Sequence, residues 1–121
     1  MYIGIDLGTS GVKVVLMDAQ GNVVATETSP LQVSRPHPLW SEQDPESWWQ
    51  ALDQAMQALS AQQDLDAVQA IGLSGQMHGA TLLDSANQVL RPACSGMMDA
   101  VRRSAVSWSR RCRIHGRSPV T

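Results

Sequence analysis

The chain has 121 residues, of which 43% are hydrophobic, and a formal net charge of −2. This length is enough for one small domain with a modest core. The composition is neither strongly basic nor marked by a run of about 20 apolar residues, so it indicates binding to neither nucleic acid nor a membrane. The chain starts without a charged and apolar leader, and the expected location is the cytoplasm.

The charge changes abruptly near residue 93. Residues 1–93 carry three basic and ten acidic side chains, a net of −7, whereas residues 94–121 carry six arginines against Asp99, a net of +5. Both cysteines, Cys94 and Cys112, lie in the second part, without the spacing of a zinc site or a disulfide framework. The two parts look as though they came from different proteins.

The first 28 residues predict a three-stranded antiparallel meander. Its strands are expected at residues 2–6, 12–18 and 23–28. Residues 19–22 have the Gly and Asn chemistry of a hairpin turn, and the gap at 7–11 is also short enough for an antiparallel return.

The first turn of this meander combines groups that suit a phosphate ligand. Asp6 ends the strand, Gly8 permits a tight turn, Thr9 and Ser10 offer hydroxyl and backbone donors, and Lys13 adds a cation. Together they could hold a hydrated magnesium ion and nucleotide phosphates. The alternative is an ordinary hairpin with a glycine turn. The segment resembles the first phosphate loop of the actin-like ATPases, which include sugar kinases and chaperones.

A helix is predicted from residue 45 to about residue 61. Asp44 is the expected N-cap, Pro45 takes the first helical position, and Glu46 adds an acidic group to the first turn. One apolar stripe contains Trp48, Leu52, Ala55, Met56 and Leu59.

Further strands are expected at residues 68–74, buried, at 80–84 and, briefly, at 89–90. A meander, a crossover helix and more strands form the start of an α/β, ribonuclease-H-like fold. The turn at residues 75–79 places Gln76, Met77 and His78 between two glycines, where they could reach a small polyol. Trp40 could form the wall of a sugar site, although His78 could equally be structural.

These segments together resemble the FGGY family of carbohydrate kinases. The family opening, G-x-D-x-G-T-x-x-x-K/R, is matched by Gly4, Asp6, Gly8, Thr9 and Lys13. Its W-x-E-x-D-P-x-x-W stretch is matched by Trp40, Glu42, Asp44, Pro45 and Trp48. The turn at 76–79 is similar to that of members that act on D-xylulose.

The resemblance implies an actin-like ATPase N-terminal domain that takes part in ATP-dependent phosphorylation of D-xylulose at its 5-hydroxyl. By carry-over, Asp6 would hold Mg²⁺ through water near the transferred phosphoryl. Gly8, Thr9, Ser10 and Lys13 would line the phosphate side.

The same resemblance assigns the sugar to Gln76, Met77 and His78, with Trp40 as a further candidate. It implies a homodimer for the intact enzyme. The aspartate base and the second phosphate loop would come from sequence outside these 121 residues, so the chain alone is expected to be inactive.

The resemblance stops after residue 93, where family members continue with a sequence close to Ile-Leu-Trp-Asn-Asp-Gly-Arg. Reading from the third base of the Cys94 codon permits Leu-Trp-Asn in the shifted frame. The consecutive methionine codons of Met97 and Met98 then force Asp-Gly, and Arg is permitted next. Residues 94–121 are therefore interpreted as a frameshifted, poorly structured tail, or as a sequencing error that mimics one.

Three alternatives remain. The tail could be a basic nucleic-acid-binding segment, although it has a single aromatic residue, Trp108, and no binding motif. The chain could belong to an FGGY kinase for another sugar or polyol. It could also be an actin-like chaperone or ATP-binding module, which would lack the segments at 40–49 and 76–79.

Overall fold

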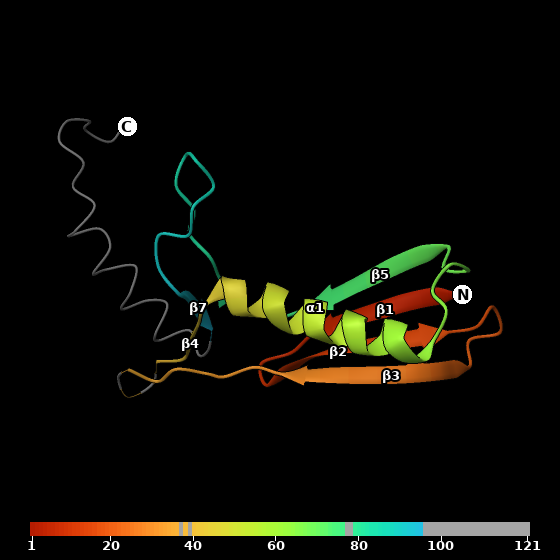
Figure 1. Ribbon diagram of the computed structural model, residues 1–121. Coiled ribbons are helices and arrows are strands. Elements are labelled where there is room, and N and C mark those ends of the chain that lie inside the picture. Colours follow the sequence, from red (N-terminus) through yellow and green to blue (C-terminus); the bar gives the residue numbers. More distant parts are fainter. Residues whose placement is uncertain (37, 39, 77–78, 96–121) are drawn as a thin grey trace, which may run out of the picture.

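The computed structural model describes residues 1–36, 38, 40–76 and 79–95 (Figure 1). Its strands are β1 Tyr2–Leu7, β2 Gly11–Met17, β3 Val23–Pro30, β4 Glu42–Gln43, β5 Ala70–Gly75, β6 Gly79–Ala80 and β7 Ala93–Ser95. Its helix is α1 Pro45–Gln62.

Four strands form the main sheet, in the order β3-β2-β1-β5. The pairs β1–β2 and β2–β3 are antiparallel, which confirms the predicted meander. The chain then crosses over through α1 and returns as β5, which runs parallel to β1. This order of strands and helix confirms the ribonuclease-H-like fold predicted from the sequence.

Helix α1 packs on one face of the sheet (Figure 1). It begins as predicted: Asp44 is the N-cap and accepts a hydrogen bond from the backbone N–H of Glu46, and Pro45 follows. The buried core consists of Ile3, Ile5, Val12, Val14, Leu16, Leu31, Ala51, Ala55 and Leu59. No helix in the described part of the chain is long and apolar enough to cross a membrane.

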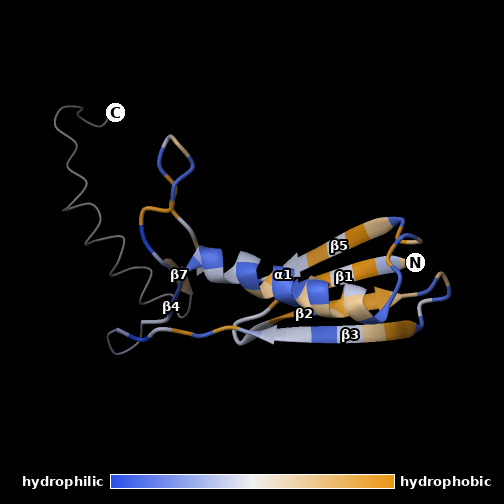
Figure 2. Ribbon diagram, viewed as in Figure 1, coloured by the Kyte–Doolittle hydropathy of each residue, from blue (hydrophilic) through white to orange (hydrophobic). Residues whose placement is uncertain are grey.

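Strand β5 corrects the prediction of a buried strand at residues 68–74. It begins at Ala70, and every residue in it is exposed, including Ile71 at 55% and Leu73 at 79%. Figure 2 shows the hydrophobic residues that occupy much of this strand. Its apolar pattern is that of a parallel strand covered on both faces. Here β5 lies at the sheet edge and α1 packs over β2 and β3 instead.

A second, small sheet has the order β4-β7-β6 and lies beyond the N-terminal end of α1 (Figure 1). The predicted strand at 80–84 is wrong beyond Ala80, and the strand at 89–90 is reduced to one isolated bridge between Leu83 and Val89. Residues 81–90 are exposed and lack the neighbouring strand that a longer ladder requires.

Strand β7 crosses the boundary between the two parts of the sequence. Cys94, the first residue of the expected tail, is buried with a free thiol and pairs with Glu42 and Ala80. Strand pairing uses backbone groups, so it does not depend on which side chain follows Ala93. The rest of the expected tail, from residue 96, lies outside the described residues.

Candidate functional site

The turn between β1 and β2, which carries the predicted phosphate-binding residues, is closed by a backbone hydrogen bond. The N–H of Gly8 donates to the carbonyl of Gly11 at 3.0 Å, which closes the turn around Thr9 and Ser10. A Cβ atom on Gly11 would lie 2.8 Å from the carbonyl oxygen of Ser29 on β3. Glycine at position 11 therefore lets β2 and β3 approach each other directly beside the turn.

Asp6 and Lys13 lie side by side on the face of the sheet opposite α1. They are cross-strand partners on β1 and β2, and both are exposed. Their neighbours Ile5 and Val14 point to the other face and are buried in the core. The structure therefore brings together the carboxylate and the cation predicted for the phosphate site.

Ser74 extends this row of polar side chains and was not predicted as a site residue. It is the β5 partner of Asp6, and it is exposed. A strand–helix–strand crossover usually returns the chain parallel to its first strand, so this pairing could have been anticipated from the order of elements. Ser74 adds a hydroxyl beside the carboxylate that would carry the metal.

Gln43 is the buried polar residue that sequence reasoning missed. Its side chain is 2% exposed and makes hydrogen bonds to three segments. The amide Nε2 donates to the carbonyl of Thr9 at 2.8 Å and to that of Gln32 at 3.3 Å, and Oε1 accepts from the indole N–H of Trp48 at 3.1 Å. Gln43 thus joins the phosphate-loop candidate to α1.

Trp40 lies beside an ion pair rather than in isolation. The guanidinium of Arg91 stacks 5.7 Å from the centre of the Trp40 ring and pairs with the buried carboxylate of Glu42. Cation–π contact of this kind fixes the orientation of the ring. One face of Trp40 is therefore occupied by Arg91.

The predicted sugar segment is only partly described. Gln76 is half-buried and follows the last residue of β5, Gly75, which pairs with Leu7 at the end of β1. It therefore leaves the sheet at the same end as the β1–β2 turn. Met77 and His78 lie outside the described residues.

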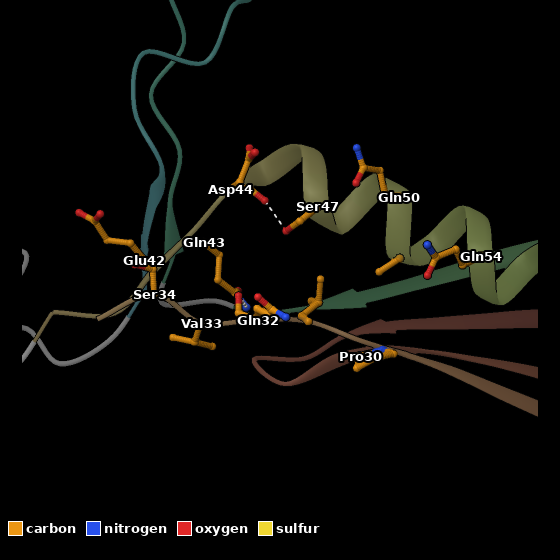
Figure 3. A pocket seen from close by; sticks show the side chains of 12 residues that line it. Pro30, Gln32, Val33, Ser34, Glu42, Gln43, Asp44, Ser47, Gln50 and Gln54 are labelled. Atoms are coloured by element: carbon orange, nitrogen blue, oxygen red, sulfur yellow. Dashed lines mark hydrogen bonds between the residues drawn. The ribbon is translucent and has the colours of Figure 1, made fainter. Parts of the chain in front are cut away.

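Of the hollows lined by described residues, two lie near α1, and Asp6 and Lys13 line neither of these two. One, of about 600 Å³, opens between residues 30–34 and the first half of α1, with Gln43 at its wall (Figure 3). The other, of about 460 Å³, is an apolar groove between α1 and β5 that includes Trp49 and Leu73.

Comparisons with known proteins decide the family. The model of the FGGY family of carbohydrate kinases, N-terminal domain, matches residues 1–116. The chain belongs to the FGGY family of carbohydrate kinases.

Within this family the chain is 70% identical over 93 residues to a xylulose kinase of Escherichia coli (strain K12), a match that covers 77% of the chain and 19% of the relative. It also resembles the crystal structure of a xyloylose kinase from Brucella ovis, with 54% identity, a TM-score of 0.73, and 77% of this chain and 20% of that one covered. The chain therefore spans about a fifth of the length of these relatives.

A gluconate kinase from Lactobacillus acidophilus has an equally similar fold. Its TM-score is 0.77 at 25% identity, and the match covers 91% of this chain and 22% of that structure. Fold similarity is therefore shared by FGGY kinases that differ in their names, and it does not distinguish their sugars.

Proposed function

We propose that the chain is the N-terminal part of an ATP-dependent D-xylulose 5-kinase. The observation that carries this proposal is the 70% identity over 93 residues to the xylulose kinase of Escherichia coli. In the reaction, the 5-hydroxyl oxygen of D-xylulose bonds to the γ-phosphorus of ATP, the bond to the ADP oxygen breaks, and the hydroxyl proton passes to a base. The aspartate expected as base belongs to sequence outside these residues.

The donor set fits MgATP. Phosphoryl transfer depends on positioning and on neutralising the charge of the phosphate oxygens. The exposed carboxylate of Asp6 would hold the hydrated metal, and bound Mg²⁺ would neutralise phosphate charge. Lys13, its cross-strand partner, would add a second positive charge. Gly8, Thr9 and Ser10 would line the phosphates from the turn.

On the sugar side, Gln76 leaves β5 at the end of the sheet that carries the turn. We assign Met77 and His78, which follow it, to the pentulose by family resemblance. Trp40 is a further candidate contact, because aromatic faces pack well against the C–H surface of sugars. By the same family resemblance, we propose a homodimer for the intact enzyme and a cytoplasmic location.

An FGGY kinase for another sugar is the second candidate, because a gluconate kinase shares the fold. The Gln76–Gly79 turn and the high identity to a xylulose kinase favour D-xylulose. A chaperone-like module is disfavoured, since the family model covers residues 1–116.

We also propose that residues 94–121 are translated in a shifted frame. The match to the Escherichia coli relative extends over 93 residues, the same length as the first part of the sequence, whereas the match to the family model continues to residue 116. The forced Asp-Gly in the shifted frame agrees with the sequence expected of the family after Ala93.

The test is a coupled assay with ATP, Mg²⁺ and a panel that includes D-xylulose, D-gluconate and glycerol. The enzyme is produced from the gene with one frame restored at codons 93 and 94, beside the 121-residue chain. The restored enzyme should turn over D-xylulose best, and the short chain should show no turnover. Preference for another sugar would replace the substrate assignment, and ATP hydrolysis that no sugar stimulates would refute the kinase assignment.

A further inference from the structure

We propose that Gln43 is a positioning residue that turns the N–H of Ser10 toward the nucleotide phosphates. This inference rests on the proposed function, because it assumes that the β1–β2 turn binds phosphate. It adds Gln43, which precedes α1, to the residues that determine the conformation of the β1–β2 turn. Figure 3 shows the Gln43 side chain pointing from β4 toward the backbone at Gln32.

The orientation of the Gln43 amide follows from its three partners. The carbonyls of Thr9 and Gln32 can only accept hydrogen bonds, and the indole N–H of Trp48 can only donate one. The amide nitrogen must therefore face the two carbonyls, and the amide oxygen must face the indole, which is the arrangement observed. Because the side chain is 2% exposed, water does not compete for these bonds.

The Thr9 carbonyl fixes the direction of the next N–H group. A trans peptide unit is planar, so the carbonyl of Thr9 and the N–H of Ser10 point in opposite directions. When Gln43 holds the carbonyl inward, the Ser10 N–H must point away from Gln43. Thr9 and Ser10 are both exposed, so this N–H is directed to the accessible side of the turn.

The following peptide unit is held in the same way by the backbone. The N–H of Leu31 donates to the carbonyl of Ser10 at 2.9 Å, which directs the N–H of Gly11 away from Leu31. The N–H groups of Ser10 and Gly11 are thus both oriented through the carbonyl that precedes each of them. The Gln43 side chain holds the Thr9 carbonyl, and the Leu31 backbone holds the Ser10 carbonyl. Successive backbone N–H groups in a turn form a concavity that binds anions.

Substitution of Gln43 by Glu separates these roles. The carboxylate of Gln43→Glu can still accept from the Trp48 indole, but it has no proton to donate to the Thr9 carbonyl. The Ser10 peptide would then be free to rotate. Gln43→Leu removes all three bonds. Gln50→Glu is the matched control, since it makes the same chemical change on the exposed side of α1.

The experiment is ¹⁵N NMR on the full 121-residue chain, titrated with MgADP and, separately, with tripolyphosphate. In the unsubstituted chain the Ser10 amide signal should shift on titration. In Gln43→Glu the dissociation constant should rise about fivefold or more, as expected for the loss of one oriented hydrogen bond. The Trp48 indole signal should stay in its hydrogen-bonded position, and Gln50→Glu should bind like the unsubstituted chain.

The outcomes separate the inference from the proposed function. If neither probe shifts Ser10 in the unsubstituted chain, the phosphate-binding role of the turn is refuted, and this inference with it. If the unsubstituted chain and Gln43→Glu bind equally well with the same Ser10 shift, only the positioning role is refuted.

If the substituted chains do not fold, the frame-restored enzyme decides. There, Gln43→Glu should lower kcat/KM for ATP by about fivefold or more while the KM for D-xylulose stays constant. An equal loss for both substrates would show a merely structural role and overturn the proposal.

Discussion

Arg91 forms an ion pair with Glu42, a residue that lies 49 positions earlier in the chain. The pair ties the segment that enters β7 to β4, and the same guanidinium stacks on the ring of Trp40. Glu42 is buried, so its carboxylate depends on this partner for compensation of its charge. The contact therefore joins β4 to the segment that enters its neighbour β7, and it fixes the tryptophan proposed as a sugar contact.

Replacing Arg91 with alanine should lower the free energy of unfolding by about 1.5–3 kcal/mol, the usual loss for a hydrogen bond to a charged group. The measurement is urea denaturation of the 121-residue chain, followed by circular dichroism. Arg35→Ala removes an exposed arginine and serves as the control, with a change near zero. Equal midpoints for the two variants would show that the ion pair contributes nothing to stability.

Gly11→Ala should destabilise the chain by about 1–3 kcal/mol, because the new methyl group would collide with the backbone of Ser29. Gly4→Ala is the matched control: it lies on β1, and a Cβ there would have no atom within 4 Å. Reducing the freedom of the unfolded chain should leave Gly4→Ala neutral or slightly more stable. Thermal unfolding of both variants compares them directly, and a Gly11→Ala variant as stable as Gly4→Ala would contradict the close approach.

The features that were predicted correctly depend on residues close together in the sequence. The two hairpins follow from short polar turns between apolar strands, and the start of α1 follows from Asp44 and Pro45 in consecutive positions. These turn and capping signals act through local backbone geometry, so they can be read without knowledge of the rest of the fold.

The features that were missed depend on residues brought together by the fold. Gln43 contacts Thr9, 34 positions away, and nothing in its immediate neighbours marks it as buried. The burial of β5 was predicted from its apolar residues, but burial requires a covering layer, and in the described part of the chain α1 does not supply it. The apolar pattern of a strand shows that the strand could be buried. Whether it is buried depends on the elements that pack against it.

Asp18 should make the stability of the chain depend on pH in the acid range. The side chain of Asn22 donates to its carboxylate, followed by the backbone N–H of the same residue, and these bonds lower the pKa of Asp18 although desolvation opposes them. A lowered pKa in the folded state adds stability above the unfolded pKa, near 3.9, that is lost as pH falls through the folded value.

Urea denaturation at a series of pH values between about 2 and 6 measures this contribution. Asn22→Ala removes the largest cause of the shift and should flatten the pH dependence. Gln20→Ala is the control, because position 20 donates through its backbone N–H and its side chain takes no part. An unchanged pH profile in Asn22→Ala would rule out the side-chain bond as the main cause.

Restoring one frame at codons 93 and 94 should give a continuous reading through Leu-Trp-Asn-Asp-Gly-Arg into a chain several times longer. The reason is that the codons of Met97, Met98 and Asp99 leave no choice but Asp-Gly in the shifted frame. Resequencing of the DNA around these codons and downstream of them tests this. A downstream region without a long open frame in that phase would rule out the frameshift.

In the frame-restored enzyme, Asp6→Asn should lower kcat by about a hundredfold or more, as expected when a group that stabilises transition-state charge is removed. The amide is nearly the same size as the carboxylate, and Asp6 is exposed, so the fold should be retained, as circular dichroism can confirm. The amide lacks the negative charge that would hold Mg²⁺ beside Lys13. His78→Ala should instead raise mainly the KM for D-xylulose, because it would remove the ground-state contact proposed for His78. Asp66→Asn, the same change at an exposed position after α1, should keep the unsubstituted kcat. A frame-restored Asp6→Asn enzyme with the kcat of this control would remove Asp6 from the metal site.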